Sequence, residues 1–293
     1  MSPFWGRREF LGLLAASALA GRVQAQAMPR IAAIDWAMLE TSVTLGVMPV
    51  AATELIQFRA GAVEPEIPET VADLGLRGAP NFELLQLTRP DLILISPFYT
   101  RYTGRLEAIA PVFSLPFYVK GEPPFEKALA AVTALGEKLG RTDEARKVLI
   151  KTEEALQAMR TRLAGFSARP TYVINIGDAR HFRAFGADSM FGDVLGRLGL
   201  ANAWVDRSQF TFAAPVPLEN LAAAPEARIV IVSDIPVEAR ESLRNSAIWR
   251  ALPAVREGRV VTLGNVGPYG GITAGMRFAR LLTEALTAQG EAL

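Results

Sequence analysis

An uninterrupted helical pattern near the middle of the chain constrains the fold more than any other feature. From Thr142 to about Leu163 the sequence contains neither Gly nor Pro. Thr142 is a candidate N-cap, and Asp143 and Glu144 precede basic residues further along. A helix of roughly 20 residues is about 30 Å long, which exceeds the needs of a small domain. The pattern therefore predicts a connection between two structural units.

Short apolar or β-branched runs alternate with helical patterns on both sides of this segment. Strands are predicted at 31–34, 47–52, 91–95, 112–113, 171–176, 228–232 and 259–263, and helices at 123–140, 189–198, 236–250 and 273–288. This alternation is typical of parallel sheets covered by helices on both faces. We predict two α/β lobes with mostly parallel central sheets, residues 28–141 and 167–293, joined by one long helix over 142–166. A ligand site is expected in the cleft between them, and a single rigid connection predicts a small closure motion.

The N-terminal residues have the features of an export signal. Arg7 and Arg8 precede a short apolar run over 11–20, and the small residues Ala25 and Ala27 flank Gln26. The run is shorter than the roughly 20 residues that a membrane span needs. We therefore predict a cleaved signal peptide over 1–27, of the twin-arginine type because the two arginines are adjacent.

The composition excludes several classes of site. Without cysteine, the chain has no disulfide, no thiolate metal site and no lipid-anchored cysteine. The single histidine, His181, cannot form an imidazole cluster for zinc, manganese or haem; we interpret it as structural. Removal of 1–27 changes the formal charge from +1 to −1, which is not the basic surface expected of a nucleic-acid-binding protein.

Several motifs resemble those of periplasmic siderophore and cobalamin receptors. They are Asp-Leu-Gly-Leu-Arg at 73–77, Pro-Asn-Phe-Glu-Leu-Leu at 80–85 and Arg-Pro-Asp-Leu-Ile at 89–93, followed by Ile-Ala-Pro at 109–111, Asn-Ala-Trp at 202–204 and Leu-Pro-Ala-Val at 252–255. The version with Gly-Leu-Arg is similar to the ferric-hydroxamate-binding proteins in particular. The resemblance covers nearly the whole chain after residue 27, with the motifs in the same order. The resemblance implies a class III periplasmic binding protein of the helical-backbone type.

The resemblance also implies a ligand site. An arginine at the position of Arg77 and a tyrosine at the position of Tyr99 donate hydrogen bonds to hydroxamate oxygens of a ferric siderophore. These oxygens retain partial negative charge, and a planar guanidinium matches paired oxygens well. The siderophore fills the coordination sphere of the iron, so we expect neither a protein metal ligand nor a cofactor.

Aromatic residues near these positions complete the predicted site. We include Phe98, Tyr102, Phe210, Phe212 and Tyr269 among the ligand-binding residues. Trp36 and Trp204 are interpreted as core residues. The chain departs from the family pattern where tryptophans line the pocket, because Gly61, Thr211 and Gly267 occupy those positions.

The resemblance implies a transport component rather than an enzyme. The resemblance implies a periplasmic, monomeric receptor that delivers its ligand to an inner-membrane ABC permease and its ATPase. Acidic residues at the tips of the lobes dock on the permease in this fold; Glu219 fits the C-terminal position. Gly104 occupies the N-terminal position, and Glu107 is the candidate substitute.

Two alternatives remain open at this point. A receptor of the same fold could bind cobalamin, haem or a catecholate siderophore. Catecholate complexes are strongly anionic and call for several basic residues, for which Arg59 and Arg101 are the candidates beside Arg77. A periplasmic hydrolase is the remote alternative, since the sequence has no Gly-x-Ser-x-Gly motif and one histidine.

Replacing Arg7 and Arg8 together by lysine tests the export route. We expect precursor to accumulate in the cytoplasm, because the twin-arginine receptor distinguishes guanidinium groups from simple positive charge. Cell fractionation and immunoblotting measure the outcome, with Arg22→Lys as the control. Normal amounts of mature protein in the periplasm would rule out the twin-arginine route.

Overall fold

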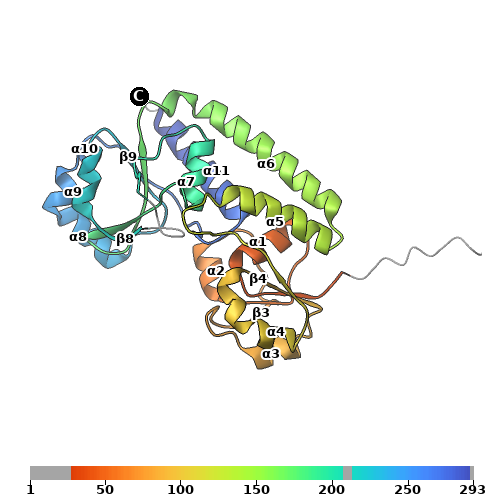
Figure 1. Ribbon diagram of the computed structural model, residues 1–293. Helices are drawn as coiled ribbons and strands as arrows, with labels where there is room; N and C mark the ends of the chain where they lie inside the picture. Colours follow the sequence, from red (N-terminus) through yellow and green to blue (C-terminus); the bar gives the residue numbers. More distant parts are fainter. Residues whose placement is uncertain (1–27, 207–212, 291–293) are drawn as a thin grey trace, which may run out of the picture.

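The computed structural model describes residues 28–206 and 213–290 (Figure 1), so the predicted signal peptide over 1–27 lies outside the described residues. Within these ranges the chain forms two five-stranded sheets, one before and one after the long helix α6 (Thr142–Arg162) in the sequence. The predicted architecture of two α/β lobes joined by one long helix is confirmed. No helix in the described ranges has the length and apolar composition that crossing a lipid bilayer requires.

The N-terminal sheet is entirely parallel, with strand order β3-β2-β1-β4-β5. Its central strands are buried along their whole length, as expected for a sheet covered on both faces. The strands are β1 (Ile31–Ala33), β2 (Ala51–Ala52), β3 (Ala72–Asp73), β4 (Leu92–Ile95) and β5 (Val112–Ser114). The helices of this half are α1 (Trp36–Thr44), α2 (Leu55–Gly61), α3 (Phe82–Leu87), η2 (Pro97–Tyr102), α4 (Thr103–Glu107) and α5 (Phe125–Lys138).

The C-terminal sheet has the order β10-β9-β6-β7-β8 and combines parallel with antiparallel pairs. Its strands are β6 (Thr171–Ile176), β7 (His181–Ala184), β8 (Ala213–Pro217), β9 (Arg228–Ile231) and β10 (Val260–Thr262). The antiparallel strands β7 and β8 were not predicted from the sequence. In β8, Pro215 and Pro217 interrupt the strand pattern, and they are tolerated because β8 is an edge strand.

The remaining helices are η3 (Ala164–Phe166), α7 (Met190–Arg197), η5 (Leu218–Ala223), α8 (Val237–Asn245), α9 (Ala247–Ala251), α10 (Pro253–Arg256) and α11 (Ile272–Gly290). Of these, α7, α8, α9 and α11 fall within or near predicted helices, whereas η5 and α10 were not predicted. The single helix predicted over 236–250 is broken at Ser246, whose extended backbone and hydroxyl cap α9. Thr142 is the first residue of α6 rather than its N-cap. The cap is Arg141, whose guanidinium donates to the carbonyl of Leu45 at 3.0 Å.

One apolar core extends through both halves of the molecule. It includes Phe58 of α2, Phe125 of α5, Leu156 of α6 and Phe191 of α7. The C-terminal helix α11 lies in the middle of this core, where Phe278 is fully buried. α11 packs against α7 on one side and against α1, α5 and α6 on the others, and Figure 1 shows α6 running along the top of this group. The lobes are therefore joined by packing as well as by α6.

A buried carboxylate joins α1 to the start of α11. Glu40 is 1% exposed, and its Oε2 accepts hydrogen bonds from the backbone N–H groups of Gly271 at 2.7 Å and Ala274 at 3.1 Å. Position 270 must be glycine, because a Cβ there would lie 2.2 Å from Glu40 Oε1. Burial raises the pKa of Glu40 to about 8, against the lowering effect of the two backbone hydrogen bonds.

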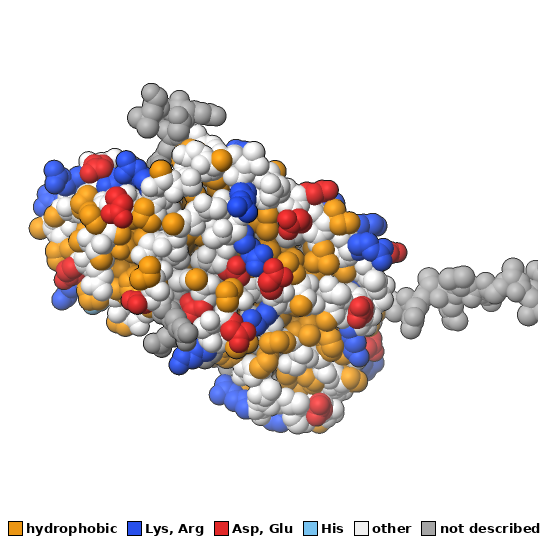
Figure 2. Space-filling model, turned by 45° about the horizontal axis from the view of Figure 1, so that its top comes forward, with side chains coloured by type: hydrophobic (Ala, Val, Ile, Leu, Met, Phe, Trp, Pro, Cys, Tyr) orange, Lys and Arg blue, Asp and Glu red, His pale blue; other side chains and the backbone are white. Residues whose placement is uncertain are grey.

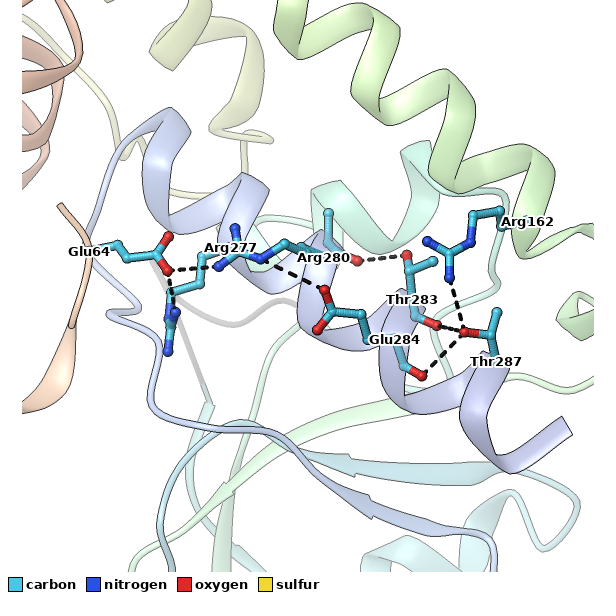
Figure 3. A network of polar contacts seen from close by, with 8 residues as sticks. Glu64, Arg162, Arg277, Arg280, Thr283, Glu284 and Thr287 are labelled. Atoms are coloured by element: carbon cyan, nitrogen blue, oxygen red, sulfur yellow. Dashed lines mark hydrogen bonds and ion pairs between the residues drawn. The ribbon is translucent and has the colours of Figure 1, made fainter. Parts of the chain in front are cut away.

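A second polar link between the halves lies on the surface of α11 (Figure 3). Glu64, in the loop after α2, accepts hydrogen bonds from Arg277 at 2.6 Å and from Arg280 at 2.7 Å. Arg277 also donates to the carbonyl of Asn265 at 2.9 Å. In the space-filling view, acidic and basic side chains gather across the middle of the molecule (Figure 2). These ion pairs supplement the apolar contacts between α11 and the N-terminal half.

The titration of Glu40 predicts a pH dependence of stability. An unfolded glutamate loses its proton near its ordinary pKa of 4.5, whereas folded Glu40 keeps it until about pH 8. Between these pH values the folded state therefore binds more protons than the unfolded state. The contribution of Glu40 to the free energy of unfolding falls as pH rises through this window. Glu40→Gln should flatten the slope of the thermal midpoint between pH 5 and pH 8.

The exposed Glu137 on α5 supplies the matched control. Glu137→Gln should leave the slope of the thermal midpoint against pH as it is in the wild type. Equal slopes for Glu40→Gln and the wild type would contradict the assignment of this titration to Glu40.

Candidate functional site

Polar residues follow the ends of four neighbouring strands of the N-terminal sheet. Asp35 comes shortly after β1, Glu54 after β2, Arg77 after β3, and Ser96 directly after β4. The carboxyl ends of parallel strands lie along one edge of a sheet, which is where such sheets bind ligands. Because the strand order is β3-β2-β1-β4, the fold brings these side chains together at that edge.

Arg77 is held by an ion pair and an aromatic ring. Its Nε donates to Oε2 of Glu54 at 2.6 Å, and its guanidinium carbon lies 4.0 Å from the centre of the Trp36 ring. The ring of Tyr269 is 5.7 Å away. A guanidinium over the ring of an indole makes a cation–π contact. Arg77 is thus oriented before any ligand binds.

Glu54 is fixed by its own backbone. It adopts a left-handed conformation with φ of 51°, which is uncommon for a residue other than glycine. Its N–H donates to the carbonyl of Gly75 at 2.8 Å, and its Oε1 accepts from the N–H of Arg77 at 3.0 Å. The carboxylate therefore binds both the backbone and the side chain of Arg77. Strained residues of this kind concentrate at functional sites.

Asp35 connects the site to α1. Its Oδ1 accepts from the N–H groups of Ala37 and Met38 at the start of the helix, and its Oδ2 accepts from the hydroxyl of Ser96 at 2.7 Å. Burial raises the pKa of Asp35, while the hydrogen bond from Ser96 and the charge of Arg77 act in the opposite direction. The carboxyl group caps the helix and forms part of the cavity wall.

Three tyrosines surround the arginine. Burial raises the pKa of Tyr99, and the nearby carboxyl of Asp35 adds to this effect; its hydroxyl therefore stays protonated at neutral pH and can donate a hydrogen bond. Tyr118 donates to the carbonyl of Gly270 at 2.5 Å and packs edge-on against Tyr269, with ring centres 6.3 Å apart. The site thus combines guanidinium and phenol groups.

Two adjoining cavities open between the halves of the molecule. The first, which we call the Arg77 chamber, has a volume of about 430 Å³ and is lined by Asp35, Glu54, Arg77, Gly78, Phe98, Tyr99, Arg101, Tyr118 and Tyr269. The second, the Gly61 chamber, has a volume of about 450 Å³ and lies between Gly61 of α2 and residues of the C-terminal half such as Phe185 and Val232. Consecutive residues of the segments 35–36 and 268–269 line one chamber and then the other, so the two are neighbours.

The structure brings most of the described ligand-site candidates together. Arg77, Tyr99, Phe98 and Tyr269 all line the Arg77 chamber. Tyr102 does not belong to its lining. The hydroxyl of Tyr102 donates to the carbonyl of Gly78, and its ring packs against Phe82 with centres 5.8 Å apart. A residue three positions after Tyr99 in the same 3₁₀ helix η2 therefore packs on the lobe instead.

The remaining aromatic and basic candidates for the ligand site differ in where they lie. Phe210 and Phe212 lie outside the described residues, as does Thr211. Arg101 lines the Arg77 chamber, whereas Arg59 donates to the carbonyls of Ile67 and Pro68 at 2.9 Å each.

Sequence reasoning missed four residues in or beside the Arg77 chamber, as well as the polar residues of the Gly61 chamber. Trp36 was interpreted as a core residue; it is 8% exposed, yet it stacks under Arg77 and lines the Gly61 chamber. Asp35, Glu54 and Tyr118 were not singled out. The signal available for Asp35 and Trp36 was their position directly after a predicted strand. Glu54 likewise lies two residues after the strand predicted over 47–52, whereas Tyr118 follows an irregular segment that gave no comparable signal.

The remaining candidates lie away from the chambers. His181 Nδ1 is 3.1 Å from Asp178 Oδ1 at the start of β7. Glu219 and Glu107 are exposed, on η5 and α4 respectively. Trp204 packs edge-on against Phe182 in the C-terminal core, with ring centres 6.0 Å apart. Among the residues described here, no group of three or more metal-ligating side chains is placed to hold an ion.

This fold and cleft define a periplasmic binding protein. Residues 31–266 match the family model described as "Periplasmic binding protein" (Peripla_BP_2), and the chain belongs to that family. The proteins that it resembles include binding proteins for iron(3+) hydroxamates and siderophores.

Individual relatives include iron receptors. The iron(3+)-hydroxamate-binding protein FhuD of Escherichia coli is 30% identical over 97% of both chains. The Fe(3+)-citrate-binding protein YfmC of Bacillus subtilis is 20% identical over 79% of this chain and 71% of its own. The crystal structure of FhuD from Vibrio cholerae with bound Fe3+–Desferal superposes with a TM-score of 0.84 at 26% identity, covering 89% of this chain and 99% of that one.

A double-mutant cycle tests the pairing of Arg77 with Glu54. Both side chains are largely shielded, with 22% and 16% of their surfaces exposed. We expect Arg77→Ala and Glu54→Ala to be coupled by about 1 kcal/mol in the free energy of unfolding, which is at the upper end for exposed pairs. Urea denaturation of the wild type, both single variants and the double variant measures this coupling. Strictly additive effects would mean that the ion pair does not persist in solution.

Proposed function

We propose that this protein is the periplasmic substrate-binding component of an ABC importer and that it binds a ferric hydroxamate siderophore between its lobes. The observation that carries the proposal is the orientation of Arg77, fixed between Glu54 and Trp36 beside the hydroxyl of Tyr99. The identity with the hydroxamate-binding protein of Escherichia coli supports the ligand class.

The chemistry of a ferric hydroxamate suits this arrangement. Three hydroxamates balance the charge of the iron, while their oxygens keep partial negative charge. A guanidinium edge and a protonated phenol donate to such oxygens without carrying the strong positive field that a highly anionic catecholate would require. Glu54 and Asp35 reduce the positive charge of the Arg77 chamber further. A nearly neutral complex is therefore favoured over a strongly anionic one.

The iron is cargo in this proposal and stays within its siderophore. The protein needs no resident cofactor and no ligand atom on the metal. Binding and release require no chemical step, and no histidine occurs among the described residues that line the two chambers. The protein acts as a receptor rather than as an enzyme.

Delivery requires contact with the inner-membrane permease, which its ATPase drives. We propose that a monomer of the exported protein docks through the exposed carboxylates of Glu219 and Glu107. These residues lie on different lobes, so arginines on the two halves of a permease could contact one each.

Substitution of Arg77 tests the ligand class. Fluorescence quenching of the protein should report saturable binding of Fe3+–Desferal, because Trp36 lies under the proposed contact. Charge-assisted hydrogen bonds contribute about 1.5–3 kcal/mol, so Arg77→Ala should weaken binding by about tenfold to a hundredfold. Arg77→Lys should recover only part of this, since an ammonium cannot reproduce the guanidinium edge.

Controls separate the contact from indirect effects. Arg77→Ala combined with Glu54→Gln removes the carboxylate that loses its partner, and its affinity should remain low. Arg105→Ala removes an arginine that lies over Phe82, 3.7 Å from the ring centre, and should bind like the wild type. Tighter binding of a ferric catecholate, haemin or cobalamin than of every ferric hydroxamate would refute the proposed ligand class.

A further inference from the structure

The Gly61 chamber differs in chemistry from the Arg77 chamber beside it. Its walls include the aromatic rings of Trp36, Phe185 and Phe191 and the aliphatic side chain of Val232. Among the described residues that line it, Arg183 alone carries a charge, and that side chain is exposed to solvent. The Arg77 chamber, by contrast, contains two carboxyl groups and two guanidinium groups. The cleft is thus divided into a charged half and a mostly apolar half.

The space in the apolar half depends on Gly61. This residue ends helix α2, and a Cβ added to it would meet no atom within 4 Å. Its backbone does not require glycine, since its φ is not positive, and glycine is less favourable than alanine in a helix. Gly267 on the opposite wall differs, because a Cβ there would lie 3.2 Å from the Cβ of Ala62. Gly267 allows close packing, whereas Gly61 leaves open volume in the chamber.

Uncharged polar groups line the C-terminal wall of this chamber. The amide of Asn175, at the end of β6, donates to the hydroxyl of Ser233, which follows β9. Asn265 donates from Nδ2 to the carbonyl of Ala60, across the lobes, at 3.2 Å. Amide and hydroxyl groups can pair with the amide groups of a ligand without demanding a charge on it. Together with the aromatic rings, they suit a chain of methylene and amide groups.

We infer that the Gly61 chamber receives an uncharged arm of the ligand, built of methylene and amide groups, while the iron centre lies against Arg77. This inference rests on the proposed function. Trp36 connects the two positions, because one part of its ring is covered by Arg77 and the residue also lines the Gly61 chamber. An arm leaving the iron centre passes over this ring into the chamber. Gly61 then determines how large an arm the receptor accepts.

A series of acylated complexes tests the inference. The terminal amine of Fe3+–Desferal is converted to the acetyl, butyryl and hexanoyl amides, and each dissociation constant is measured by fluorescence quenching. Each methylene that becomes buried strengthens binding by up to about fourfold. Since the chamber is partly open, the hexanoyl complex should bind the wild type on the order of tenfold more tightly than the acetyl complex.

Gly61→Leu should abolish this gain with chain length, because its side chain occupies the same volume. The acetyl complex should lose the least affinity in this variant, because its arm is the shortest of the series and the Arg77 contacts are unchanged. Gly196→Leu is the matched control: Gly196 is also near the end of a helix, α7, and an added Cβ there also meets no atom within 4 Å. This variant should keep the full gain. Thermal melting of both variants confirms that they are folded.

The possible results are distinguishable. Equal affinity along the acyl series, or a gain retained in Gly61→Leu, would overturn the assignment of this chamber to an arm. A succinyl amide has the length of the butyryl amide and adds a carboxylate. Tighter binding of the succinyl complex would show an anion site and overturn the inference that the arm is uncharged. Failure of every ferric hydroxamate to bind the wild type would instead refute the proposed function and this inference with it.

Discussion

The layer of helices between the two sheets fixes the geometry of the cleft. Helices α1, α5, α6, α7 and α11 contribute to one apolar core, so the N-terminal and C-terminal walls of the chambers rest on the same packed layer. Close-packed interiors resist deformation. The hydrogen bonds from Gly271 and Ala274 to Glu40, and those from Arg277 and Arg280 to Glu64, add polar contacts across the junction. Such a junction favours small adjustments of the lobes over wide hinge closure.

This rigidity extends to the functional groups. The left-handed backbone of Glu54 fixes the position of its carboxylate, and the carboxylate orients Arg77. The guanidinium of Arg77 also lies over the ring of Trp36. A donor that is already oriented loses little conformational freedom when a ligand binds, which favours affinity. The carboxylate of Glu54 accepts the hydrogen bond from Nε of Arg77. The terminal N–H groups of the guanidinium are therefore the ones that can donate to a ligand. Recognition in the Arg77 chamber therefore depends on the residues that orient Arg77 as much as on Arg77 itself.

The sequence predicted the architecture well because its signals are local. The apolar run at 91–95 identifies β4 and thereby places Tyr99 at the carboxyl end of a strand, and the gap-free pattern after Thr142 identifies α6. Other features depend on contacts between distant segments. Tyr102 shares the aromatic character of Tyr99 but turns to the carbonyl of Gly78. Nothing local distinguishes the two.

The residues that were missed illustrate the same limit. Trp36 is both buried and part of the cleft, and composition alone favours the core interpretation. Glu54 lies two residues after the strand predicted over 47–52, of which Ala51–Ala52 forms β2, but its role depends on a left-handed conformation that the local sequence does not indicate. In β8, two prolines hide an edge strand whose partner is β7. Tertiary position, rather than residue type, decides each case.

The position of α11 has a consequence for how the protein acquires its structure during synthesis. Residues 272–290 pack against α1 and α5, although more than two hundred residues separate α1 from α11 along the chain. Until this segment leaves the ribosome, the inner face of the N-terminal sheet lacks Phe278 and its neighbours, and Glu40 lacks both of its backbone donors. The N-terminal lobe therefore cannot complete its folding during translation as an independent unit would. Both lobes reach their final packing together, only after nearly the whole chain has been made.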